Sequence, residues 1–75
     1  MNNTNFISLV KIKLTQGIFV FYKDFQHQLF VDEKSGKIYI NDVNNGTCSL
    51  FVDDNMQIQG TPEDYIIFDP EQENN

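Results

Sequence analysis

The chain has 75 residues, of which 40% are apolar and 13% aromatic, and it contains no Ala, Arg or Trp. Eleven acidic residues against five lysines give a net charge of −6 and a pI near 4.3. This charge disfavours binding to nucleic acid or to an anionic membrane, because Lys and Arg supply most of that affinity. A chain of this length forms one small domain, and the lack of Ala and Arg, both good helix formers, favours β structure.

The ends of the chain and its cysteine content indicate where it functions. Residues 1–5 and the acidic segment 69–75 are polar, so we expect flexible tails around a single β domain at 6–68. The N-terminal residues resemble neither a signal peptide nor a membrane span. Cys48 is the only cysteine, which excludes an internal disulfide and favours a reducing, cytoplasmic location.

In chain order, the first predicted element is a hairpin around the turn at 15–17. Apolar residues alternate with polar ones on both sides of this turn, so Leu14 should pair with Ile18. Gly17 then occupies the left-handed bulge position that three-residue hairpin loops favour.

Four more turns follow, at 23–26, 33–36, 44–46 and 53–55. The second and third of the five turns place Leu29 opposite both Val20 and Ile40. The fourth pairs Ile40 with Leu50, and the fifth pairs Val52 with Met56. The result is an all-β fold, a six-stranded antiparallel meander.

These registers place one aliphatic set on a single face of the sheet. Its members are Val10, Ile12, Leu14, Ile18, Val20, Leu29, Val31, Ile38, Ile40, Leu50, Val52, Met56 and Ile58. Such a face must be buried, so we expect the sheet to curl into a small half-open barrel or to dimerise.

Residues 61–68 allow two interpretations. Thr61 followed by Pro62 and two acids is typical of a helix start, which predicts one short C-terminal helix that plugs the barrel. The β-prone run 65–68 favours a seventh strand instead.

The opposite face of the predicted sheet is aromatic. It carries Phe19, Phe21, Phe30, Tyr39 and Phe51, with Lys11, Lys13, Gln57 and Gln59 as a polar rim. Exposed apolar patches of this kind mark interaction sites. The alternatives are a second small core, covered by the segment around Phe6, Ile7 and Leu9 or by the C-terminal segment, and a contact between copies of the chain.

The sequence carries no motif for catalysis, metal binding or a cofactor. The registers place His27 and Cys48 on separate strands, and the acidic pairs lie in turns where acids are solvated. Asp42 to Asp53 faintly resembles a calcium loop, but its glycine is misplaced and strands flank it, so a hairpin turn explains it better.

We therefore expect a small acidic, non-enzymatic module that binds another protein, with a basic partner favoured by charge. From charge alone, a phage or mobile-element inhibitor that occupies a basic surface of its partner is a further hypothesis. Two alternatives stay open: a single-stranded nucleic-acid binder that stacks bases on the aromatic face, and a structural homo-oligomer.

Overall fold

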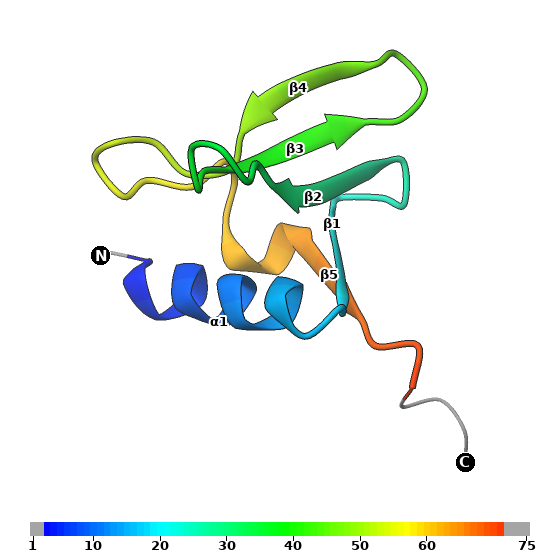
Figure 1. Ribbon diagram of the computed structural model, residues 1–75, viewed down its shortest axis with the longest axis horizontal. Coiled ribbons are helices and arrows are strands. Elements are labelled where there is room, and N and C mark those ends of the chain that lie inside the picture. The colour runs from blue at the N-terminus through cyan, green and yellow to red at the C-terminus, as the bar shows by residue number, and fades with distance from the viewer. Residues whose placement is uncertain (1–2, 72–75) are drawn as a thin grey trace.

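A computed structural model describes residues 3–71, in which one helix packs against one face of a five-stranded antiparallel sheet (Figure 1). The elements are α1 (Thr4–Thr15), β1 (Phe19–Tyr22), β2 (His27–Val31), β3 (Ile38–Asp42), β4 (Thr47–Leu50), η1 (Pro62–Asp64) and β5 (Tyr65–Phe68). The strand order is β4-β3-β2-β1-β5, and the sheet does not close into a barrel. Within 3–71, no helix has the length and apolarity needed to cross a membrane.

The helix α1 replaces the predicted first strand and begins inside the predicted tail 1–5. Ile7 and Val10 are buried and Leu14 packs beside them, so the apolar residues recur every three to four positions, as in a helix. Gly17 ends the helix with φ +80°, where Ile18 N–H donates to Lys13 O at 2.9 Å and Gly17 N–H to Leu14 O at 3.1 Å. Gly17 is therefore left-handed as predicted, but it caps a helix and not a hairpin.

The two central hairpins have the predicted registers. Leu29 pairs with Ile40 and Val31 with Ile38, while the pairing of Phe21 with Gln28 places Val20 opposite Leu29. In each turn an acid accepts a nearby backbone N–H, Asp24 from Gln26 and Asp32 from Ser35, so local chemistry suffices to set the register.

The β3–β4 register differs from the prediction by one residue. Ile40 pairs with Ser49 and not with Leu50, and the turn spans four residues, in which Asp42 accepts N–H bonds from Asn44 and Asn45. A slip of one residue exchanges the two faces of a strand. Phe51 therefore lies in the core, fully buried, and Leu50 lies on the opposite face.

The next loop is also longer than predicted. Val52 bridges to Ile58 and not to Met56, since the Asp53 carboxylate accepts N–H bonds from both Asn55 and Gln57. Met56 sits in this loop and is 44% exposed.

Residues 61–68 contain both of the elements that the sequence allowed, a helical turn followed by a strand. The helical start is real but forms only the short η1, where Thr61 N–H donates to Asp64 Oδ2 at 2.9 Å. The strand β5 then pairs with β1, with Val20 opposite Ile67. It occupies the position beside β1 that the sequence had suggested for residues 10–14.

The core lies between α1 and the sheet. We call this side of the sheet the packed face. Its buried side chains are Ile7, Val10, Val20, Leu29, Ile38, Ile40 and Phe51. The Tyr65 ring closes it, with its centroid 5.3 Å from those of both Phe51 and Phe6. Several predicted members of the aliphatic face are outside this core: Ile12, Val31 and Met56 are exposed, and Leu50 is on the other side.

Candidate functional site: the open aromatic face

The side of the sheet opposite α1 carries a group of large apolar side chains, which we call the open face. Because side chains alternate along a strand, the residues between the buried positions all point to this side. The strand members are Phe19, Phe21, Phe30, Tyr39, Leu50, Ile66 and Phe68, and Phe25 joins them from the β1–β2 turn.

The rings of the open face contact one another and not the core. Phe19 stacks on Phe21 and on Phe68, with centroids 6.3 Å and 6.4 Å apart. Phe25 meets Phe21 edge-on at 4.9 Å. These rings and Gln28 line one apolar hollow of the surface. Of these pairs, Phe19 and Phe68 lie on neighbouring strands, and a cross-strand ring pair stabilises a sheet modestly.

Phe30 and Tyr39 form a second ring pair on the neighbouring strands β2 and β3. Their rings stack at 5.7 Å, and Leu50 stands opposite Tyr39 on β4. The open face therefore extends across all five strands.

The open face is exposed to solvent. Phe25 is 65% exposed, and Phe19, Phe30, Leu50 and Phe68 are each between 37% and 41% exposed. Figure 1 shows no helix on this side of the sheet within residues 3–71. The expectation of a second small core covered by the N-terminal segment is therefore wrong, because Phe6 and Ile7 pack on the other face.

The structure brings together four of the five aromatic residues expected at the site and removes the fifth, Phe51, to the core. Sequence reasoning missed four members, Phe25, Leu50, Ile66 and Phe68. Phe68 follows from interpreting 65–68 as a strand, whereas Leu50 depends on a register that no local pattern reveals.

The expected polar rim is also absent from the open face. Lys11 and Lys13 belong to α1, on the packed side, and Gln57 lies in an exposed loop. Gln59 donates from Nε2 to Ser49 Oγ and to Leu50 O, both at 2.9 Å, and so occupies the edge of β4. No lysine belongs to any of the five strands.

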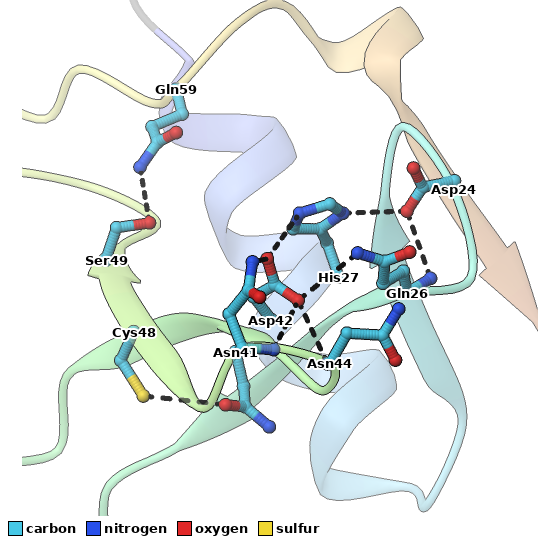
Figure 2. A network of polar contacts seen from close by, with 10 residues as sticks. Asp24, Gln26, His27, Asn41, Asp42, Asn44, Cys48, Ser49 and Gln59 are labelled. Carbon is cyan, nitrogen blue, oxygen red and sulfur yellow. Dashed lines mark hydrogen bonds and ion pairs between the residues drawn. The ribbon is translucent and has the colours of Figure 1, made fainter.

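A polar network lies at the end of the sheet formed by the β1–β2 and β3–β4 turns (Figure 2). The imidazole of His27 is placed between two carboxylates, with Nδ1 2.7 Å from Asp24 Oδ1 and Nε2 3.4 Å from Asp42 Oδ2. Its hydrogen bond to Asp24 raises the pKa of His27 above the ordinary value, and the same bond lowers the pKa of Asp24. Asp42 also accepts the side-chain amide of Gln26 at 3.3 Å.

This network does not form a nucleophilic site with Cys48. The thiol lies 3.7 Å from Asn41 Oδ1 on the open-face side, whereas His27 pairs across the sheet with Asp42 (Figure 2). Across residues 3–71 there is no group of three His, Cys, Asp or Glu side chains arranged to hold a metal ion. The calcium-like stretch from Asp42 to Asp53 instead forms the β3–β4 turn, where Asp42 accepts backbone N–H groups, and then β4.

No protein-family model matches this chain, and comparisons with curated proteins and with solved structures found no significant match.

Proposed function

We propose that this protein is a small, non-enzymatic binding module that docks a partner protein on its open face. The observation that carries the proposal is a continuous group of aromatic and aliphatic side chains, from Phe25 to Leu50, that nothing within residues 3–71 covers. Soluble domains seldom leave such a patch bare unless it is used. Aromatic side chains are also the residues enriched at the energetic centres of protein interfaces.

Charge favours a partner whose contact surface is apolar at its centre and basic around it. The chain carries a net charge of −6, and acids adjoin the open face in sequence, with Asp24 before Phe25 and Asp69 after Phe68. A second copy of this chain would bring two like charges of this size together, which opposes self-association. More specifically, the protein acts as an inhibitor that covers a basic surface of its target.

The distribution of lysines argues against single-stranded nucleic acid as the ligand. Base stacking on Phe or Tyr needs a basic groove alongside it to hold the phosphates. The lysines lie in α1 and in turns, and none belongs to a strand of the open face.

The test compares wild type with a Phe19→Ser/Phe30→Ser double variant and an Ile12→Ser control. Ile12 is also a large exposed apolar residue, at 53%, but it lies on α1 away from the open face. A protein captured by the wild type is purified, and its affinity for all three chains is measured by calorimetry. We expect the control to bind like wild type, the double variant to bind at least tenfold more weakly, and affinity to fall with salt.

Three outcomes would overturn the proposal. The first is equal affinity of the double variant, since the partner would then use another surface. The second is a concentration-independent dimer in light scattering that Phe19→Ser/Phe30→Ser dissociates, which assigns the open face to self-association. The third is tight binding of a labelled single-stranded oligonucleotide at low salt, lost in the same variant.

A further inference from the structure

The β1–β2 turn, residues 23–26, has an unfavourable backbone conformation. Lys23 has φ +69°, and Asp24 N–H donates to Tyr22 O at 2.7 Å, which closes a three-residue γ-turn. Turns of this kind with positive φ at a non-glycine residue are rare and strained. Such a conformation persists only where neighbouring contacts hold it.

His27 and its partner Asp24 supply part of those contacts, beside two backbone bonds that do not involve the imidazole: Lys23 N–H donates to Asp64 O at 2.6 Å, and Val43 N–H donates to Gln26 O at 3.0 Å. Asp24 Oδ1 accepts the Gln26 N–H at 3.0 Å and lies 2.7 Å from His27 Nδ1, while His27 N–H donates to Asp24 O at 3.3 Å. On its other side the imidazole lies 3.4 Å from Asp42 Oδ2 (Figure 2). The imidazole therefore links the strained turn to the end of β3.

This turn also carries the most exposed ring of the open face. Phe25 lies between Asp24 and Gln26 in the chain, and its ring meets Phe21 edge-on at 4.9 Å. Any change in the turn therefore moves a ring that lines the apolar hollow with Phe19 and Phe68.

The protonation state decides whether His27 can bond to both carboxylates. A neutral imidazole has one N–H and can donate to only one of them, which leaves a lone pair facing the oxygen of the other. An imidazolium donates from both nitrogens and also carries the charge that attracts two acids. Tyr22 lines the same cleft as His27, Cys48 borders the cleft with its thiol directed to Asn41 Oδ1, and Lys23 lies nearby, with its Nζ 5.4 Å from the Tyr22 ring.

We propose that His27 is a proton-operated latch: when charged it locks the β1–β2 turn and holds Phe25 against Phe21, and when neutral it releases them. The open face then presents its complete aromatic surface only to a partner met under mildly acidic to neutral conditions. The regulatory consequence rests on the proposed function, but the latch itself is a property of the isolated chain.

The test needs no partner and uses the full chain. Nuclear Overhauser contacts between the rings of Phe21 and Phe25 are measured by NMR from about pH 5.5 to about pH 8.5, a range across which histidine changes charge. The imidazole of His27 is followed by its own chemical shifts in the same samples. We expect the ring contacts to weaken as pH rises, with the midpoint of the His27 titration.

Two variants separate the latch from general effects of pH. His27→Gln keeps a single donor amide and cannot become charged, so its ring contacts should stay weak and independent of pH. Asp32→Asn removes an acid that bonds to Ser35 in another turn, at 2.7 Å from Ser35 Oγ, and should keep the wild-type pH response. Ring contacts that stay constant while His27 titrates, or a pH response that survives in His27→Gln, would overturn the latch. Neither result depends on whether a partner binds the open face, so a failure of the proposed function is seen separately.

Discussion

The two faces of the sheet are built from the same strands, yet they differ in what covers them. On the packed face, Val20, Leu29 and Ile40 are at most 3% exposed beneath α1. On the open face, the neighbouring residues Phe19 and Phe30 are 40% and 38% exposed and contact mainly other rings. A sheet with one solvated side ordinarily has polar residues there. The aromatic content of the open face departs from this pattern, and the departure is the basis for proposing that the open face binds a partner.

Two consecutive residues on opposite faces, Leu50 and Phe51, should differ most in how much their replacement lowers stability. Phe51→Ala removes a fully buried ring and should lower the free energy of unfolding by about 3–5 kcal/mol. This loss is comparable to the total stability of so small a domain, so most of the molecules should be unfolded. Leu50→Ala, at an exposed position, should cost no more than about 1 kcal/mol. Urea unfolding followed by circular dichroism measures both. A larger loss of stability in Leu50→Ala than in Phe51→Ala would mean that β4 has the register in which Leu50 points into the core.

Two glycines with positive φ, Gly60 and Gly36, differ in how closely side chains pack around them. Gly60 has φ +65°, and a Cβ there would meet the Asp64 carboxylate and lie 2.9 Å from the Tyr22 hydroxyl. Gly36 has φ +76° but open space around it. Gly36→Ala should cost only the left-handed backbone strain of about 1–2 kcal/mol, and Gly60→Ala should cost more in the same unfolding assay. Equal losses would show that Tyr22 and Asp64 move aside freely.

The open face should contribute little to stability and much to binding. Phe30→Ser breaks the ring pair with Tyr39, a cross-strand contact worth about 0.2–1 kcal/mol, so the variant should stay folded. If Phe30 is at the centre of the interface, partner affinity should fall by about 2 kcal/mol or more. A cooperative unfolding transition like that of wild type, measured beside calorimetric titration, checks both statements. Loss of the fold in Phe30→Ser would instead assign the ring to a structural role.

The smallest effect concerns pH. Because the pKa of His27 is raised in the folded chain, its interaction with Asp24 adds stability at pH values below the ordinary histidine pKa of about 6.5. That contribution is lost as pH rises through the higher pKa of the folded state. The difference in Tm between wild type and His27→Gln should therefore shrink as pH rises from about 6 to about 8. A difference that grows over this interval would contradict the geometry around Asp24.

Features that depend on neighbouring residues could be predicted from the sequence alone. The two central hairpins have the expected registers, because the residues of each turn interact locally, Asp32 with Ser35 in one and Asp24 with Gln26 in the other. The alternation along those strands then placed Phe19, Phe21, Phe30 and Tyr39 together on one side, which is the basis of the candidate site.

Packing between distant segments resolves the elements for which local patterns allow two structures. The run from Ile7 to Leu14 satisfies both helical and strand spacing, and it is helical because Ile7 and Val10 then cover the packed face. Residues 65–68 could form either element, and they pair with β1 because α1 leaves that edge unoccupied. The β3–β4 register depended on Phe51, whose ring gains more by burial in the core than the side chain of Leu50 would. Each of these outcomes is set by packing between segments far apart in the chain, which local spacing does not encode.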